Sequence, residues 1–224
     1  KWRQWVDRTD VEDPFDRAMY ALVENVDENM GRLLAKLEAL EILDETVFIF
    51  LTDNGPNGSR FNDGMRGWKS SVDEGGVRVP LFVRWPKRIR AGTVVKPNVA
   101  HIDLLPTLSR IAGVENLKKK TLPLDGMDVT PLLFGQDDFE MPERNLFVWS
   151  KPQKWSVRTS RYRATETMLH DLIADPGQKE NLARKRPEIH GELIEAYRRW
   201  AAEATDEEPA LLPIPIGYEE WPTV

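Results

Sequence analysis

Four polar residues near the middle of the chain have the types and spacing of a site for a metal ion and an oxyanion. Asp53 and Asn54 directly follow the apolar run 46–52, and a carboxylate beside an amide carbonyl suits a hard divalent cation. Arg66 and Lys69 lie in the next loop, where they could receive a tetrahedral oxyanion beside that cation. Two plainer alternatives stay open. Asp-Asn-Gly is an ordinary turn sequence, and charged loop residues are commonly solvated.

The apolar run at 46–52 predicts the strand that positions the Asp-Asn pair. Its unbroken apolar character is typical of a strand buried on both faces of a parallel sheet, and ligands of open α/β sheets bind at the carboxyl edge. A helix is expected before it, because Asp13-Pro14 is a cap followed by a proline at the first helical position. Apolar residues then recur at helical spacing and predict a stripe that packs on the sheet: Leu22, Val26, Met30, Leu33, Leu37 and Leu40.

The loop after the pair is rich in glycine and runs from Gly55 to Gly76. It returns into a second apolar stretch at 77–85, so it is tied to a predicted strand at each end. Long loops inside compact domains are usually functional or disordered. A loop held at both ends favours the functional reading, with Arg66 and Lys69 fixed beside the carboxyl edge of the first strand.

Several sequence blocks occur together in the order found in one known family. The blocks are Thr52-Asp-Asn-Gly, Gly67-Trp-Lys69, Glu74-Gly-Gly-Val-Arg-Val-Pro80, Ile102-Asp-Leu-Leu-Pro-Thr-Leu108 with Ala112-Gly113, and weaker ones at 171–177 and 180–183. With them the chain from Ala18 to Ala183 resembles the second half of a sulfatase of the alkaline-phosphatase-like superfamily. The resemblance implies an α/β fold, part of a mostly parallel sheet flanked by helices, followed by a small α+β subdomain with an antiparallel sheet and a covering helix.

The resemblance also implies roles for the site residues. Asp53 and Asn54 would be ligands of one Ca2+ ion, and Lys69 would contact the sulfate group as a catalytic and substrate-binding residue. Arg66 is expected to bind the substrate beside it. The substrate would be a sulfated small molecule or a sulfated carbohydrate, and the family favours a periplasmic or secreted location.

Two departures from the family pattern bear on activity. The family commonly reads Lys-Gly-Ser/Thr-x-Tyr-Glu-Gly-Gly, whereas this chain has Lys69-Ser-Ser-Val-Asp73-Glu-Gly-Gly. The formylglycine nucleophile of the family arises from Cys/Ser-x-Pro-x-Arg, and the nearest string, Ser150-Lys-Pro-Gln-Lys154, ends in lysine and is interpreted as a loop coincidence. The chain therefore reads as a sulfatase fragment with half of an active site. The formylglycine is expected in a missing N-terminal half, and the fragment alone is expected to be inactive.

The predicted domains are residues 1–143, the C-terminal portion of the α/β catalytic domain, and residues 144–224, the antiparallel subdomain with an extended tail. Within the first, Asp103 is expected to cap a helix that ends at Gly113. Its inward face would hold Leu105, Leu108 and Ile111. His101, just ahead of that cap, is interpreted as structural, because no second residue of ligand type lies at metal spacing.

In the second domain, half-polar runs at 145–149, 155–159, 162–165 and 168–172 predict an antiparallel meander. Pro187 opens a helix that could cover the meander with Ile189, Leu193, Tyr197, Trp200 and Ala204. His170 is expected to be a packed or exposed strand residue, and the tail 209–221 is expected to be extended.

Composition excludes several classes of function. The net charge of −6 over 224 residues gives no basic footprint for nucleic acid or an anionic membrane. No apolar run is long enough to span a membrane, and the absence of cysteine excludes disulfides and thiolate chemistry. The expected protein partners are the missing N-terminal half or further copies of the chain.

Three functions remain open on the sequence. The first is the metal-binding half of a sulfatase, and the second is a phosphoryl or phosphonyl hydrolase of the same superfamily. The third is a non-catalytic, sulfatase-like binding module. The identity of the nucleophile, in sequence upstream of Lys1, separates the three.

Overall fold

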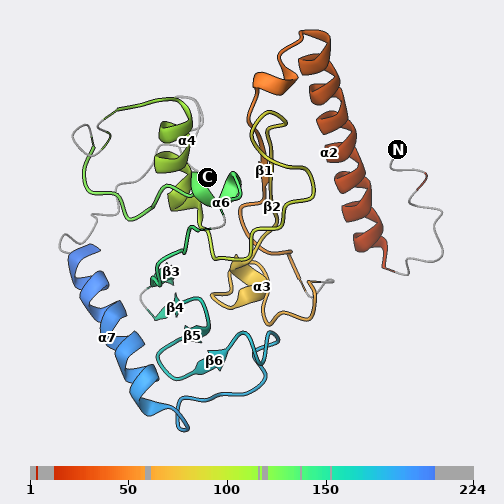
Figure 1. The fold of residues 1–224 in the computed structure, drawn as a ribbon. Helices are drawn as coiled ribbons and strands as arrows, with labels where there is room; N and C mark the ends of the chain where they lie inside the picture. Colours follow the sequence, from red (N-terminus) through yellow and green to blue (C-terminus); the bar gives the residue numbers. More distant parts are fainter. Residues whose placement is uncertain are drawn as a thin grey trace, which may run out of the picture. The chain divides into compact units, whose positions relative to one another are not determined.

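The computed structural model describes residues 4, 13–58, 62–115, 117, 121–136, 138–151 and 153–204. The chain divides into two compact units, residues 1–144 and 145–224, and each has a sheet of its own (Figure 1). No helix of the described residues is long and apolar enough to cross a membrane. The tail predicted at 209–221 lies outside the described residues.

The first unit begins with α2 (Pro14–Ala39), which starts where the sequence predicted. The side chain of Asp13 accepts a hydrogen bond from Phe15 N at 2.8 Å, as an N-cap does. After α2 the chain passes through η1 (Leu43–Glu45) into β1 (Phe48–Leu51).

The expected packing of the apolar stripe of α2 on the sheet is wrong for this chain. Leu22, Val26, Leu33 and Leu40 of that stripe are 46–58% exposed. The reason is size. A helix of 26 residues is about 39 Å long, whereas the strand that follows has four residues and spans about 13 Å.

The sheet of the first unit has two described strands, β1 and β2 (Leu81–Arg84). They pair antiparallel, with Phe48 opposite Arg84 and Leu51 opposite Leu81. The prediction of a strand buried on both faces between parallel neighbours is therefore wrong for β1, whose residues are half-buried or exposed. Among the described residues β1 has a neighbouring strand on one edge only.

The remaining helices of the first unit are short: α3 (Glu74–Val77), η2 (His101–Asp103), α4 (Leu104–Ile111) and α6 (Thr130–Leu133). The predicted inward face of α4 is wrong, since Leu105 and Leu108 are 51% and 39% exposed while Pro106 and Thr107 are buried. Thr107 Oγ1 accepts a hydrogen bond from Val129 N at 3.0 Å. His101 is exposed.

Asp103 is a buried hub of hydrogen bonds and is not a simple helix cap. It is 2% exposed, and its side chain makes no capping hydrogen bond to α4. Its carboxylate accepts from Ala100 N at 2.8 Å and Met127 N at 3.0 Å, and from both terminal nitrogens of Arg144 at 2.7 and 2.5 Å. Arg144 also donates to Asn98 O at 3.0 Å. These bonds join the N-terminal end of α4 to the backbone at residues 98, 100 and 127.

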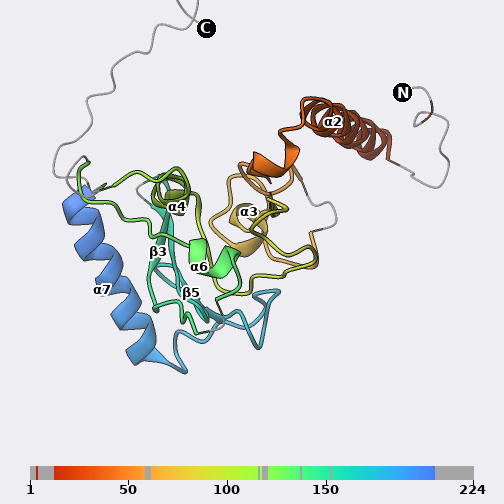
Figure 2. The same ribbon diagram turned by 45° about the horizontal axis from the view of Figure 1, so that its top comes forward.

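The second unit is the predicted meander with its covering helix. Its strands are β3 (Leu146–Lys151), β4 (Lys154–Arg158), β5 (Tyr162–Ala164) and β6 (Leu169–Asp171), paired antiparallel in that order. α7 (Pro187–Ala204) runs along this sheet and contacts β4 and β5 (Figures 1 and 2). Aromatic rings fill the contact, with Trp155 stacked on Tyr197 at 3.6 Å and Phe147 on Trp200 at 4.8 Å between ring centroids.

The strand residues that alternate with this apolar core are polar and also buried. Arg163 lies opposite His170, and each is 1% exposed. Arg163 donates to Ser156 Oγ at 2.6 Å, and His170 Nδ1 lies 2.7 Å from Glu180 O. His170 is thus a packed strand residue, one of the two placements that the sequence predicted for it.

Candidate metal and sulfate site

Asp53 and Asn54 leave β1 in a turn that orders both side chains. Asn54 N donates to Asp53 Oδ1 at 2.8 Å, and the Asn54 amide nitrogen donates to Gly55 O at 2.9 Å. Neither Asp53 Oδ2 nor Asn54 Oδ1 makes a hydrogen bond with a described residue. The turn interpretation and the metal interpretation are therefore compatible, because the turn uses the donors of the pair and leaves two oxygens for a cation.

Backbone hydrogen bonds tie the following loop to this turn. Gly55 N donates to Gly76 O, and Lys69 N donates to Pro56 O, each at 2.9 Å. The approach is so close that a Cβ on Gly55 would lie 1.8 Å from Gly75 O. The structure therefore brings the backbone of Lys69 to the turn that carries Asp53 and Asn54, as the sequence predicted for a loop held at both ends.

Polar contacts inside the loop fix its path between residues 62 and 76. The amide of Asn62 donates to Met65 O at 2.9 Å and Gly67 O at 3.0 Å. Gly67 has a φ of +84°, which a residue with a side chain rarely adopts. Gly75 N donates to Arg66 O at 2.8 Å, so the loop folds back on itself before α3.

The two predicted cations, Arg66 and Lys69, differ in their contacts. Arg66 Nε lies 3.8 Å from Asp73 Oδ2, so a carboxylate partly compensates the charge of Arg66. Lys69 is exposed, and its ammonium makes no hydrogen bond or ion pair with a described residue. Lys69 is therefore the cation better placed to meet a ligand.

Sequence reasoning did not anticipate the role of Asp73. Its carboxylate accepts from Ser71 Oγ at 2.7 Å, and its backbone N–H donates to the same hydroxyl at 3.0 Å. The available signal was the departure from the family pattern, since an acid stands at Asp73 where the pattern has tyrosine. Because Asp73 lies in the same glycine-rich loop as Arg66, an ion pair between these opposite charges could have been predicted.

Asp53 and Asn54 offer the types of ligand that Ca2+ binds, but two residues are too few to complete its coordination shell. Carboxylate and amide oxygens are the ligands that Ca2+ takes, six to eight in all. Among the described residues no three His, Cys, Asp or Glu side chains group so as to hold a metal ion. Asp53 and Asn54 would thus supply only part of a shell.

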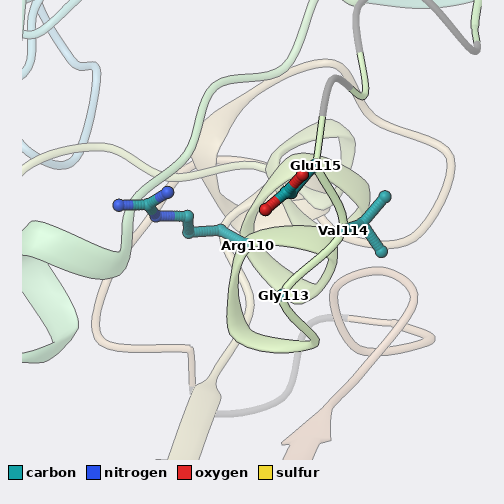
Figure 3. Close-up of a pocket in the computed structure, with 4 residues that line it drawn as sticks. All are labelled: Arg110, Gly113, Val114 and Glu115. Atoms are coloured by element: carbon teal, nitrogen blue, oxygen red, sulfur yellow. The ribbon is translucent and has the colours of Figure 1, made fainter.

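A depression of about 500 Å³ lies elsewhere in the first unit, at the C-terminal end of α4. Arg110, Gly113, Val114 and Glu115 line it (Figure 3). The guanidinium of Arg110 points away from the Glu115 carboxylate in this view and lies 4.0 Å from Asp128. No predicted site residue is among its lining residues, and it brings together no set of groups with a chemistry of its own.

Comparison with known proteins decides the family. A family model described as Sulfatase matches residues 3–114, and a second, described as N-sulphoglucosamine sulphohydrolase, C-terminal, matches residues 64–197. The chain belongs to the sulfatase family. Human (Homo sapiens) arylsulfatase A is 36% identical to it over 165 residues, which cover 67% of this chain and 31% of that protein.

Solved structures confirm the α/β fold class. The structure described as "Crystal structure of Ps i-CgsB in complex with k-i-k-neocarrahexaose" matches with a TM-score of 0.83 at 21% identity, over 94% of this chain and 48% of that one. "Structure of BT4656 in complex with its substrate D-Glucosamine-2-N, 6-O-disulfate" matches with a TM-score of 0.65 at 26% identity, over 86% of this chain and 41% of that one. The chain thus spans less than half the length of these sulfatase-family relatives.

Proposed function

We propose that this chain supplies two calcium ligands and a sulfate-binding lysine to a sulfuric ester hydrolase. The observation that carries the proposal is the pair of backbone hydrogen bonds that join Gly55 to Gly76 and Pro56 to Lys69. They support the proposal because they hold the backbone of Lys69 at the turn that carries Asp53 and Asn54. Membership of the sulfatase family supports the reaction class.

Each residue has a distinct role in this proposal. Asp53 and Asn54 present the oxygens that would hold Ca2+, which when bound would offset negative charge on the sulfate oxygens. The ammonium of Lys69 donates a charge-assisted hydrogen bond to a sulfate oxygen, and the bond strengthens as negative charge develops there. Arg66 adds a weaker positive potential, because Asp73 lies 3.8 Å from its Nε.

The substrate in this proposal is a sulfated carbohydrate. The substrate named for BT4656 is a disulfated glucosamine, which supports the class. Trp68 is 51% exposed and precedes Lys69 directly, so it offers an apolar face against which a sugar ring can stack. Trp68→Ala should raise KM for glucosamine 6-sulfate several-fold and leave kcat unchanged. An unchanged KM would remove Trp68 from the site.

The decisive experiment compares two variants of the sulfatase that contains this chain across a calcium titration. Lys69→Ala deletes the donor at the reacting group and should cost about 2.7–4 kcal/mol in kcat/KM, as loss of other preorganised donors does. Added calcium should not restore it. Asp53→Ala removes a charged metal ligand, so its rate should recover in part as calcium rises.

Metal content is measured in parallel, and Lys96→Ala is the matched control. Lys96 is an exposed lysine outside the site loop, and its removal should leave kcat/KM unchanged. A Lys69→Ala rate within a few-fold of wild type would remove that residue from the site. Full metal content and a full rate in Asp53→Ala would remove the Asp53-Asn54 pair from the site.

The isolated chain is expected to be inactive, because it contains no formylglycine motif and only part of a metal shell. Turnover of an aryl sulfate by the purified chain above a buffer blank, lost in Asp53→Ala, would contradict this. The formylglycine nucleophile belongs to the rest of the hydrolase in this proposal.

The charge balance of the loop favours a sulfate ester over a phosphate ester. A sulfate monoester carries one negative charge, whereas a phosphate monoester carries about two near neutral pH. Asp73 compensates part of the Arg66 charge, which leaves Lys69 as the main cation among the described residues of the loop. Asp73→Asn should remove this charge compensation and raise the ratio of phosphate to sulfate monoester hydrolysis. An unchanged ratio would contradict this account of the selectivity.

A further inference from the structure

The basic side chains of one loop in the first unit are gathered without acidic residues beside them in the sequence. Asp and Glu make up 37 of the 224 residues, yet none occurs between residues 75 and 102. Within that stretch, residues 84–93 at the end of β2 and after it form a segment that we call the basic loop. Its four cationic side chains are all exposed: Arg84, Lys87, Arg88 and Arg90. The net charge of −6 hides this surface, because acids elsewhere in the chain outweigh it.

Backbone hydrogen bonds fold the basic loop into two consecutive turns. Arg88 N donates to Trp85 O at 2.9 Å, and Thr93 N donates to Arg90 O at 3.3 Å. The hydroxyl of Thr93 donates to the same carbonyl at 2.8 Å. The indole of Trp85 ties the first turn to η1, because its Nε1 donates to Asp44 O at 3.1 Å. The cations are therefore carried on an ordered backbone, which lowers the conformational entropy that is lost when a ligand binds.

Contacts with described residues compensate the charge of the basic loop only in part. The ammonium of Lys87 forms an ion pair with Glu45 of η1, and Asp44 adds a second negative charge to η1. The side chains of Arg84 and Arg90 make no hydrogen bond or ion pair with a described residue. These two guanidinium groups are therefore available to an anionic ligand.

The cations also indicate that the basic loop meets solvent in any longer protein that contains this chain. Arg and Lys are almost never fully buried unless they are paired, because taking an ion out of water costs several kcal/mol. A protein surface that covered the loop would have to supply an acid for each unpaired guanidinium. A soluble polyanion supplies such charges, and guanidinium groups bind oxyanions through two parallel hydrogen bonds.

The basic loop and the proposed sulfate site lie at opposite ends of the β1–β2 pair. Arg84 lies opposite Phe48, where β1 begins, whereas Asp53 follows the other end of β1 (Figure 1). A strand of four residues spans about 13 Å. The basic loop is therefore beyond hydrogen-bond reach of the sulfate group that Lys69 contacts in the proposed function. It can bind a second sulfate group of the same ligand when that ligand is an extended chain.

We propose that the basic loop is a second binding surface, which holds a sulfated polysaccharide through sulfate groups other than the one to be hydrolysed. The inference rests on the proposed function, since the polymer is the substrate of that site. A polymer held at the loop keeps its other sulfate groups at a high effective concentration near Lys69. The loop should therefore lower KM for a sulfated polymer and leave KM for a sulfated monosaccharide unchanged.

Calorimetric titration measures this binding directly. Dextran sulfate is titrated into the sulfatase that contains this chain, with unsulfated dextran as the ligand control. Arg84→Gln/Arg90→Gln removes two charges from the loop, and Arg84→Lys/Arg90→Lys keeps both. The matched control is Arg198→Gln/Arg199→Gln, which removes two exposed arginines of α7 and changes the net charge equally.

Wild type should bind dextran sulfate and not dextran, with an affinity that falls as salt is raised. The glutamine variant of the loop should bind dextran sulfate about 2- to 25-fold more weakly, since each exposed ionic contact contributes about 0.2–1 kcal/mol and about 1.4 kcal/mol is a factor of ten. The lysine variant and the α7 control should stay close to wild type. In hydrolysis, the glutamine variant should raise KM for a sulfated polymer by a similar factor and leave KM for glucosamine 6-sulfate unchanged.

Equal loss of affinity in the loop variant and the α7 control would overturn the proposal, as would equal binding of dextran and dextran sulfate. Tighter loop-dependent binding of phosphatidylserine vesicles than of dextran sulfate would also overturn it, because the partner would then be a membrane surface. Inactive Lys69→Ala together with dextran sulfate binding that does not depend on the loop would refute this inference alone. Loop-dependent binding together with full activity of Lys69→Ala would leave the polymer surface standing and refute the proposed function alone.

Discussion

Replacing Asp103 by alanine should destabilise the first unit more than any surface substitution in it. The Asp103 carboxylate accepts from two backbone N–H groups and from two nitrogens of Arg144. Its removal leaves the Ala100 and Met127 N–H groups without that acceptor. It also leaves a guanidinium whose side chain is only 17% exposed without its carboxylate.

The size of the destabilisation follows from the polar groups that lose their partner when the Asp103 carboxylate is removed. An orphaned buried N–H costs about 1–3 kcal/mol, and breaking a buried ion pair by removing one partner costs about 3–5 kcal/mol. These two costs overlap, since the same cavity relaxes around both, so we expect about 3–5 kcal/mol in total. That is a large share of the roughly 5–15 kcal/mol by which a domain is stable.

Hydrogen exchange with mass spectrometry measures the effect where it arises. Because the chain has two units, one unfolding free energy for the whole protein is poorly defined. Peptides spanning 98–104 and 124–130 should exchange faster in Asp103→Ala by about two to four orders of magnitude, at 1.4 kcal/mol per factor of ten, whereas peptides spanning β4 to β6 should not change. The matched control is Arg110→Ala, which breaks a solvent-exposed pair with Asp128 at 4.0 Å and should cost no more than about 0.5 kcal/mol. Equal exchange rates of these peptides in Asp103→Ala and Arg110→Ala would refute the stabilising role of the Asp103 hub.

Three further outcomes are expected. Burial disfavours ionisation of Asp103, but hydrogen bonds from Arg144, Met127 N and Ala100 N outweigh it and hold the pKa of the carboxyl below its ordinary value. This stability is present above the unfolded pKa of about 3.9 and is lost as pH falls through the folded pKa. The advantage of wild type over Asp103→Asn in the urea unfolding of the first unit should therefore shrink below about pH 4. Gly55→Ala should destabilise the first unit by about 1–3 kcal/mol in thermal unfolding, because its Cβ meets Gly75 O, while Gly31→Ala in the open helix face of α2 should stabilise it by about 0.5–1 kcal/mol. Tyr197→Ala should lower the urea midpoint of the second unit by an amount equivalent to about 3–5 kcal/mol, and Tyr197→Phe, which keeps the stacked ring, should cost little.

The second unit could be predicted from sequence because its pattern is local. Strands of three to six residues form short, half-polar runs, and tight links set their order. The residues predicted to line α7 include Leu193 and Tyr197, which are buried, since one helix face meets one sheet inside the same 60 residues of chain. What the pattern did not show is that Arg163 and His170, the polar alternates, are buried as well.

The first unit shows the limit of the same reasoning. The start of α2 depends on Asp13 and its neighbours and could be predicted. Which face is buried depends on distant chain, so the predicted inward sides of α2 and α4 were both wrong. Asp103 has the residue type of a cap, but its partners Met127 and Arg144 lie 24 and 41 residues away. No local pattern reports such contacts.

In the proposed site, backbone hydrogen bonds explain why substitution of the metal ligands and substitution of Lys69 should affect the rate independently. Lys69 is held at the turn by its own N–H to Pro56 O, and the loop closes through Gly55 N and Gly76 O. These bonds need no side-chain ligand and no ion, so the position of Lys69 does not depend on what Asp53 and Asn54 bind. Loss of the metal should then lower the rate without displacing the lysine, and loss of the lysine should leave the oxygens of the pair in place. Gly55 is the residue that links the two, because the close approach to Gly75 O requires the absence of a side chain there.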